Sequence, residues 1–429
     1  MTVNTMSPSK RALPAYARER RIAERAVHRA SILTKRAISL TPSYWASSPI
    51  SSPSSRKLSN GELSKSDASP VTAADFAAQA LLISAIHGAF PSDRFVGEED
   101  ADSLRRDPLL AVQVFDFVRQ YAKVAICPAD DEYPVDLLSE EEEELYAPAS
   151  IEEMLHIIDL GGRGKGGQTG RFWALDPIDG TATFVKGQQY AVSLALIEEG
   201  KEVVGVLGCP NLKLPGDGRP VEETSIDQEG VGLLLSAVRG QGAWVRPMGW
   251  EGSKLRVAER IEDLHRKQSP ASSPTANGIN GRSVNGAEKK TPLALSDLHF
   301  IDSSLSTATL SHKVREIATA CGAASTPFTE LYSSHVRYVA LILGGREAVQ
   351  VRFPRHSSKH PATMCIWDHA GAQLIYTESR NGKGKVTDLH GKEIDFGRGR
   401  KLAGNWGIVT ADESVHGRIL ELVGGMLEE

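Results

Sequence analysis

The hexapeptide DPIDGT, at residues 176–181, brings together the residue types that bind a hard cation. Asp176 and Asp179 stand three positions apart after the apolar run FWAL, where a strand is expected to end. Carboxylate oxygens are preferred ligands of Mg²⁺, and the carbonyl of Ile178 could supply a third oxygen. Thr181 adds a hydroxyl at the same corner. Asp-Pro and Asp-Gly are also common in turns, so the hexapeptide alone leaves a plain turn open.

Three further acidic segments lie at expected element boundaries. Glu98 follows an apolar pair in the sequence GEED. Asp368 precedes the apolar run AGAQLIY, where an Asp could equally be the N-cap of a helix. Asp75 follows Thr72 at the spacing of a capping box, which is a sufficient role for both residues. Together the four segments are what a phosphatase with several metal ions requires, because such ions neutralise the phosphate and lower the pKa of the attacking water.

The elements that would position these residues alternate between helices and strands. Helical spacing of apolar residues predicts helices at 15–39 and 73–90. The first carries arginines on its other faces and is expected to be amphipathic. Strands are expected at RFWALD, YAVSLALIEEG, EVVGVLGCP and GLLLSAVRGQGAWV, between residues 171 and 245. The glycine-rich stretch 161–170 matches no phosphate-binding motif, so we assign it no nucleotide.

Composition divides the chain into two domains. Residues 1–14 are expected to be a disordered tail. An N-terminal α+β domain is expected at 15–260, with a Ser- and Pro-rich flexible connection at 41–66. Residues 261–292 are interpreted as a low-complexity insertion or linker. Residues 293–429 alternate strand-like and helix-like segments, which predicts a C-terminal α/β domain.

The overall composition favours a globular protein that acts on small molecules. The 429 residues are 41% hydrophobic and 24% charged. The sequence contains no run of 18 apolar residues, so we expect no membrane span. The net charge of −5 is too mild to indicate nucleic acid as a partner. The acidic stretch 130–144 is expected to be solvated surface. Four cysteines without a CxxC pair give no zinc signature and fit reduced thiols. A cytoplasmic location is expected, and the Arg- and Ser-rich start keeps a mitochondrial one open.

The order of the motifs resembles the lithium-sensitive, magnesium-dependent phosphatase superfamily, which includes inositol monophosphatase and fructose-1,6-bisphosphatase. The resemblance rests on DASPVTAAD, GEE, DPIDGT and WDHAG. The wider strings GRFWALDPIDGTATFVKGQQYAVSLALI, GCPNL and AVRGQGAW are most similar to the fungal 3′(2′),5′-bisphosphate nucleotidase family. This resemblance implies a five-layer α/β/α/β/α sandwich, with the site in a cleft between the two domains.

The resemblance also implies roles for the acidic segments. The ligands of two or three Mg²⁺ ions would be Glu98, Asp176, Asp179, Asp368 and the carbonyl of Ile178. Thr181 would accept a proton from the attacking water, and Asp75 would accept the hydroxyl proton of Thr181. Li⁺ would inhibit by entering a Mg²⁺ position with half the charge.

Substrate contacts follow from the same comparison. The residues that would bind the substrate are Thr181, Ser334, Arg337, Arg352, Asp368 and His312. Arg337 and Arg352 suit a second phosphate, because a guanidinium binds phosphate in a bidentate manner. Near residues 303–312 the sequence departs from the His-Ser-Ser-His-like string of the family, which leaves the equivalence of His312 open.

The implied reaction is hydrolysis of the 3′-phosphate of adenosine 3′,5′-bisphosphate to AMP and phosphate, with 3′-phosphoadenylyl sulfate as a second substrate. Its role would lie in sulfate assimilation and salt tolerance, in a monomeric protein whose partner is a small nucleotide. One alternative is an inositol phosphate phosphatase of the same superfamily. Another is a catalytically silent nucleotide sensor. The pair Asp75 and Thr181 argues against the sensor, because a pure binding protein has no need of a water-activating pair.

Overall fold

The computed structural model describes most of the chain. The described residues are 14–39, 63–64, 70–124, 144–214, 220–251, 256–268, 292–304, 309–323, 325, 328–355 and 364–427. Four of the expectations above fall mainly outside these residues: the disordered tail, the flexible connection, the acidic stretch and most of the low-complexity insertion. Within the described residues, no helix is both long enough and apolar enough to cross a membrane.

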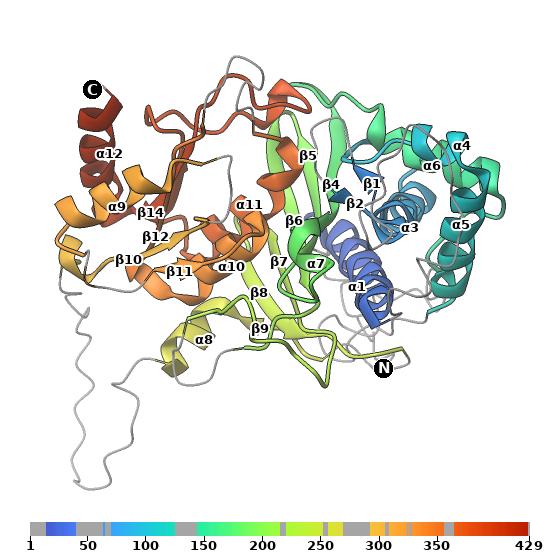
Figure 1. Ribbon diagram of the computed structural model, residues 1–429, viewed down its shortest axis with the longest axis horizontal. Coiled ribbons are helices and arrows are strands. Elements are labelled where there is room, and N and C mark those ends of the chain that lie inside the picture. The colour runs from blue at the N-terminus through green and yellow to red at the C-terminus, as the bar shows by residue number, and fades with distance from the viewer. Residues whose placement is uncertain are drawn as a thin grey trace, which may run out of the picture.

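The described elements stack in five layers, α/β/α/β/α (Figure 1). From one side to the other, the helix layers contain α1 (Ala17–Ser39) with α3 (Ala73–Ala89), then α10 (Ser334–Leu343) with α11 (Ala370–Ser379), then α9 (Ser311–Ala320) with α12 (Glu413–Leu427). A seven-stranded sheet separates the first two helix layers, and a five-stranded sheet separates the last two. The predicted five-layer sandwich is therefore confirmed.

The larger sheet belongs to the N-terminal half of the chain. In spatial order its strands are β3 (Arg94–Gly97), β4 (Arg171–Asp179), β5 (Ala191–Glu198), β6 (Lys201–Cys209), β7 (Leu233–Val238), β8 (Gly242–Pro247) and β9 (Glu259–Arg260). β3 runs parallel to β4, and every other neighbouring pair is antiparallel. All four predicted strand segments are found in this sheet.

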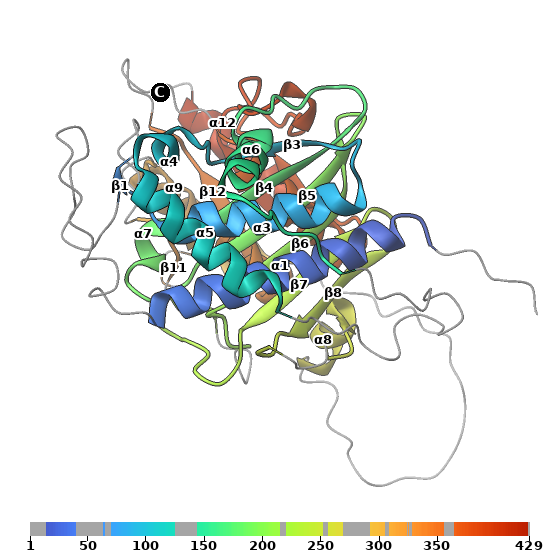
Figure 2. The same cartoon turned by 90° about the vertical axis from the view of Figure 1, so that its right-hand side faces the viewer.

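Helices on both faces explain why the central strands are almost continuously apolar. Along β4, Trp173 and Leu175 pack on the side of α1 and α3, whereas Phe172 and Ala174 pack on the side of α10 and α11. Figure 2 shows the first of these faces, with α1, α3 and α5 (Pro108–Ala122) in front of the strands. The strand that carries DPIDGT is thus fixed from both sides.

The smaller sheet belongs to the C-terminal half. Its spatial order is β11 (Thr329–Glu330), β10 (His299–Asp302), β12 (Ala348–Arg352), β14 (Ile408–Asp412) and β13 (Gly384–Thr387). β10 is parallel to both of its neighbours, while the pairs with β14 are antiparallel. A separate apolar cluster joins this sheet to α9 and α12. The helix α8 (Ile261–Gln268) follows β9 and contacts β8 and β9 of the larger sheet, so the low-complexity insertion expected from residue 261 begins with an ordered helix whose Ile261 is buried.

The helix expected at 15–39 is found as α1, and most of its arginine-bearing side is buried as well as its apolar side. Arg29 has no exposed surface and donates hydrogen bonds of 3.0–3.1 Å to four backbone carbonyls. These acceptors are the carbonyls of Leu81, Ala122, Leu145 and Tyr146. The spacing of apolar residues along the helix could not show that other segments would surround its cationic face as well.

Candidate active site

The two aspartates of DPIDGT lie in an irregular stretch of β4. The pairing of β4 with β5 shifts register between Asp176 and Asp179, so β4 has one extra residue there. Pro177 has no N–H for the sheet, and Asp176 Oδ1 accepts a hydrogen bond of 3.1 Å from the backbone N–H of Ile178. The segment is therefore a bulge at the end of the strand, because β4 ends at Asp179 as predicted.

Glycine closes this stretch. Gly180 has φ = +92°, a left-handed conformation that favours glycine. The next residue, Thr181, begins the short helix α7 (Thr181–Phe184). Its hydroxyl donates a hydrogen bond of 3.1 Å to the carbonyl of Ile178. A carbonyl oxygen has two lone pairs, so this contact leaves Ile178 able to bind a cation as well.

Asp368 reaches the same place from the C-terminal half. It ends a 3₁₀ turn, Ile366–Asp368, directly before α11. The N-cap of α11 is His369, without a side-chain cap, so the alternative of Asp368 as a helix cap is excluded. The start of α11 lies directly on β6, because a Cβ placed on Gly205 would come within 2.5 Å of the Gly371 carbonyl oxygen. This close packing of two glycines brings Asp368 toward β4.

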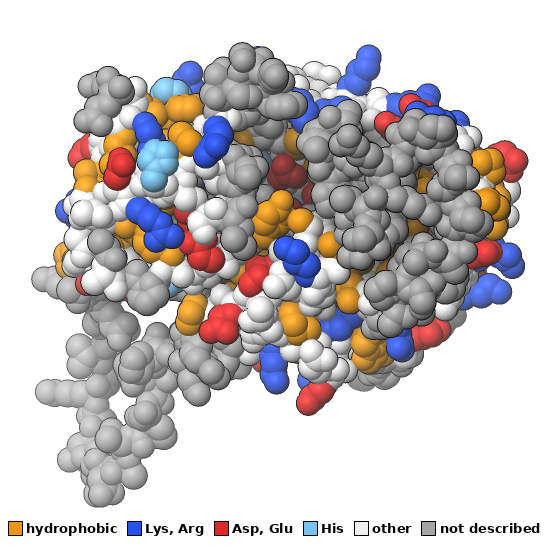
Figure 3. All heavy atoms as spheres, in the orientation of Figure 1, with side chains coloured by type: hydrophobic (Ala, Val, Ile, Leu, Met, Phe, Trp, Pro, Cys, Tyr) orange, Lys and Arg blue, Asp and Glu red, His pale blue; other side chains and the backbone are white. Residues whose placement is uncertain are grey.

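Asp176, Asp179 and Asp368 form one cluster. Each offers a carboxylate oxygen within 4.8 Å of those of the other two. Burial, together with the charges of Asp179 and Glu98, raises the pKa of Asp368 to about 7. Figure 3 shows acidic side chains at the base of a hollow on this face of the molecule. Oxygen donors that repel one another in a buried place fit a hard cation such as Mg²⁺.

Glu98 approaches the cluster from β3. β3 runs parallel to β4, and its last residue, Gly97, lies opposite Leu175. The residues that follow these two, Glu98 and Asp176, are therefore neighbours across the two strands. Glu98 is half-buried, and its charge contributes to the raised pKa of Asp368. Glu98 is not among the three carboxylates that lie within 4.8 Å of one another, and its role as a cation ligand stays a prediction.

The first turn of α10 holds Asp179. The hydroxyl of Ser333 and the backbone N–H of His335 both donate to Asp179 Oδ2, the latter at 2.7 Å. The ring Nε2 of His335 lies 2.8 Å from the carbonyl oxygen of Trp367. Sequence reasoning missed His335, because the string YSSHVRY shows no spacing that separates a bonded histidine from its neighbours.

Asp75 closes the predicted capping box at the start of α3. The backbone N–H and the hydroxyl of Thr72 donate to Asp75 Oδ2 at 2.8 and 2.7 Å. The capping interpretation is therefore confirmed. The preceding strand β2 (Pro70–Val71) contacts α7, which begins with Thr181. Asp75 and Thr181 thus lie on neighbouring segments, and a proton relay between them stays a prediction.

The two arginines predicted to bind a second phosphate differ in their surroundings. Arg352, at the end of β12, is half-buried and has no hydrogen bond or ion pair in the described part of the chain. Its charge lowers the pKa of Asp368, which indicates that it lies near the acidic cluster. Arg337 is buried and donates to the carbonyls of Leu331 and Tyr332. It also donates to the hydroxyl of the half-buried Ser334.

His312 and Glu223 differ in how close they lie to the acidic cluster. His312 is exposed in the first turn of α9, in the outermost helix layer, and is not brought to the cluster by any described contact. Glu223, which sequence reasoning missed, lies between β6 and β7 and accepts a hydrogen bond of 3.4 Å from the N–H of Tyr332. Burial raises its pKa to about 7, and Asp179 contributes to the rise. No motif in the surrounding polar sequence marks Glu223.

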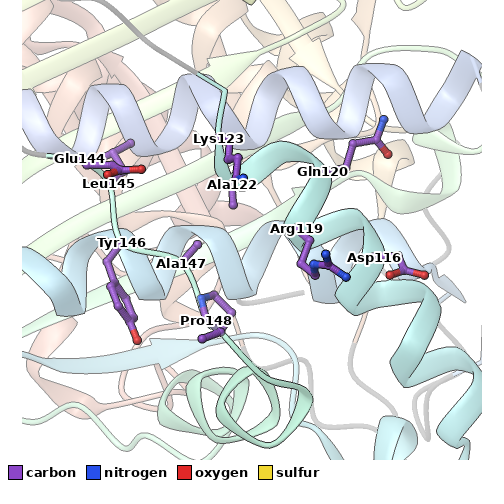
Figure 4. Close-up of a pocket in the computed structure, with 11 residues that line it drawn as sticks. Asp116, Arg119, Gln120, Ala122, Lys123, Glu144, Leu145, Tyr146, Ala147 and Pro148 are labelled. Carbon is purple, nitrogen blue, oxygen red and sulfur yellow. The ribbon is translucent and has the colours of Figure 1, made fainter.

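A separate pocket of about 690 Å³ lies between α5 and residues 144–149, over α1 and α3 (Figure 4). Charged groups of both signs line it, including Asp116, Arg119 and Lys123. None of the predicted site residues is among its lining residues. The acidic cluster is therefore a site of its own, distinct from this pocket.

Comparison with known proteins shows which family this chain is similar to. The model of the inositol monophosphatase family matches residues 119–425. A 3′(2′),5′-bisphosphate nucleotidase of Emericella nidulans is 33% identical over 96% of this chain and 99% of the relative. The 3′,5′-bisphosphate nucleotidase 2 of Arabidopsis thaliana is 32% identical over 85% of this chain and 88% of the relative. Among solved structures, an extragenic suppressor protein suhB from Bartonella henselae aligns with a TM-score of 0.46 at 16% identity, over 94% of this chain and 97% of that one.

Proposed function

Because this chain belongs to the inositol monophosphatase family, we propose that it hydrolyses the 3′-phosphate of adenosine 3′,5′-bisphosphate to AMP and phosphate. The observation that carries the proposal is the convergence of Asp176, Asp179 and Asp368 from two halves of the chain. Relatives that align over nearly the full length carry the name of this nucleotidase.

The acidic cluster supports a role for Mg²⁺. Glu98, Asp176, Asp179, Asp368 and the carbonyl of Ile178 would hold two or three such ions. Bound there, the ions would neutralise the phosphate and make the attacking water more acidic. Thr181 would take a proton from that water and Asp75 would take the hydroxyl proton of Thr181, which makes the pair the positioned base of the reaction.

The arrangement of the second half of the chain supports recognition of a bisphosphate. Arg352 is a cation with no ion pair in the described residues, close to the cluster but not part of it. It would bind the phosphate that is not cleaved, with Ser334 and Arg337 beside it. A substrate fixed at both phosphates loses orientational freedom, which aids turnover as well as affinity.

The family name equally allows an inositol phosphate as substrate, so the test must compare the two. We expect kcat/KM for adenosine 3′,5′-bisphosphate to exceed that for inositol 1-phosphate by orders of magnitude, in one buffer with saturating Mg²⁺. A ratio near or below one would assign the site to inositol phosphates. Binding of the nucleotide without release of phosphate would instead indicate a silent sensor.

A further inference from the structure

His335 is bonded to both halves of the acidic cluster. Its backbone N–H donates to Asp179 Oδ2 at 2.7 Å. Its side chain reaches the carbonyl oxygen of Trp367, the residue immediately before Asp368, at 2.8 Å. One residue thus contacts a ligand-bearing segment of the N-terminal half with its backbone and one of the C-terminal half with its ring.

The chemistry of the ring fixes the direction of the second bond. A carbonyl oxygen only accepts, so Nε2 of His335 carries the proton and donates to Trp367. Nδ1 is then left buried with no hydrogen-bond partner, and the residue has no exposed surface. Leaving a buried polar atom unpaired is unfavourable, because the atom loses its hydrogen bond to water and gains none in the protein. An apolar side chain would avoid that penalty, so the needs of the core alone do not account for a histidine here.

The bond matters because Asp179 and Asp368 reach the cluster from different elements, the strand β4 and the turn Ile366–Asp368. β4 carries Asp179, whereas the turn Ile366–Asp368 packs on β4 and β5, and its Ile366 N–H donates to the carbonyl of Arg400 at 3.1 Å. These contacts hold the start of the turn. The hydrogen bond from His335 to Trp367 holds its end, next to the carboxylate whose position must be correct to within about 0.5 Å.

We infer that His335 is a positioning residue, whose Nε2–H holds Asp368 at the correct distance from Asp179 for both to bind one cation. The inference rests on the proposed metal-dependent function. Partners that orient metal ligands without touching the metal typically contribute about 10- to 100-fold to metal affinity. Loss of this hydrogen bond should therefore weaken cation binding even where the fold is intact.

The test compares two substitutions of His335 in the full-length protein. His335→Leu removes the donor at similar size, whereas His335→Gln keeps an amide N–H near the position of Nε2. His28→Leu is the matched control, because His28 is also fully buried and its Nε2 lies 2.7 Å from a backbone carbonyl, that of Gly249. Mg²⁺ binding to the metal-free proteins is measured by titration calorimetry, and thermal unfolding is measured with and without Mg²⁺.

We expect His335→Leu to weaken Mg²⁺ binding by about tenfold or more and to require correspondingly more Mg²⁺ for half-maximal activity. His335→Gln should bind Mg²⁺ nearly as well as the wild type, and His28→Leu should lower the melting temperature without changing Mg²⁺ affinity. Unchanged Mg²⁺ affinity in His335→Leu, or equal weakening in both His335 variants, would overturn the inference while leaving the proposed function standing. A wild-type protein that binds no Mg²⁺ would overturn both.

Discussion

The protein buries charge in two regions, and it treats that charge in opposite ways. In α1, the carboxylate of Glu24 is enclosed between Arg20 and Arg246, each at 2.8 Å. Despite burial, these arginines lower the pKa of Glu24. In the acidic cluster, Asp179 and Asp368 form no ion pair with any described residue, and the pKa of Asp368 rises to about 7.

The opposite pKa shifts of Glu24 and Asp368 distinguish charges that stabilise the fold from charges that are available to a ligand. Around α1, every buried charge discussed above has its partner within the chain, so the cost of desolvation is offset and the helix is locked to its surroundings. At the cluster, Asp179 and Asp368 face like charges and have no ion-pair partner among the described residues, which raises the free energy of the site. A region of this second kind is stabilised by a ligand of opposite charge, so we expect the two regions to respond differently to neutralising substitutions.

Neutralising a cluster carboxylate should have the largest effect on activity. Asp179→Asn keeps the shape and still accepts hydrogen bonds from the first turn of α10, but it removes one charge from the proposed cation site. We expect kcat/KM to fall by on the order of 10³-fold or more. The melting temperature of the metal-free protein should not fall, because repulsion within the cluster is relieved. Asp176→Asn should behave alike, and near-normal turnover in both variants would reduce DPIDGT to a turn.

The reverse pattern is expected in α1. Arg29→Met would leave the carbonyls of Ala122, Leu145 and Tyr146 without their donor, and we expect a loss of about 3 kcal/mol in unfolding free energy. Arg29→Lys should rescue little of it, because one ammonium cannot reach four acceptors in a fixed fork. Urea unfolding measures the loss. Activity per folded molecule, with Mg²⁺ saturating, should stay within about twofold, since no predicted site residue contacts Arg29.

The sequence predicted the acidic cluster better than it predicted α1, and the reason is physical. Carboxylates that bind one cation must stand at fixed places in the chain, so strings such as DPIDGT and WDHAG can be recognised locally. Strands buried on both faces are likewise visible as apolar runs such as YAVSLALIEEG. These local strings carried the family resemblance that implied the five layers and the three aspartates that the structure brings together.

Partners that come from distant segments leave no such string. Arg29 is satisfied by carbonyls 52 to 117 positions away, and any residue type supplies a carbonyl. His335 acts through its own backbone and through the backbone of Trp367. Whether a charged residue is enclosed therefore depends on tertiary packing, which composition and periodicity do not encode.

The two regions should also differ in their response to acid. Burial lowers the pKa of His28 in α1 to about 4, and the charge of Arg246 adds to the effect. Between the unfolded pKa near 6.5 and the folded value, the unfolded chain binds more protons, so stability falls as pH falls. His28 alone should contribute a loss of up to about 3 kcal/mol by pH 4. Other buried histidines shift in the same direction, so the useful quantity is a difference between two proteins.

His28→Gln provides that difference, because it keeps a donor for the Gly249 carbonyl but does not titrate in this range. We expect its urea-unfolding free energy to decline less steeply than that of the wild type between pH 6.5 and pH 4.5. Parallel curves would show that His28 is protonated in the folded protein without penalty, which would contradict its burial in α1 as the cause of the lowered pKa.

The smallest expected effect on activity comes from substituting the two arginines near the acidic cluster, Arg337 and Arg352. Arg337 resembles the charges of α1, because it is buried and donates to Leu331, Tyr332 and Ser334. Burial and the neighbouring Arg352 lower the pKa of Arg337 to about 10. Arg352 resembles the cluster, because its guanidinium has no hydrogen-bond acceptor among the described residues. A half-buried cation in that state is available to a phosphate.

We therefore expect the two arginines to separate in a substrate comparison. Arg352→Ala should lower kcat/KM for adenosine 3′,5′-bisphosphate on the order of tenfold, while 3′-AMP, which lacks the second phosphate, should change little. Arg337→Ala should lower the melting temperature and reduce activity on both substrates together, because it releases the loop that precedes α10. Equal losses on both substrates in Arg352→Ala would mean that this charge stabilises the site rather than the second phosphate. Arg352 would then be a structural charge like those of α1, although its guanidinium has no hydrogen-bond acceptor among the described residues.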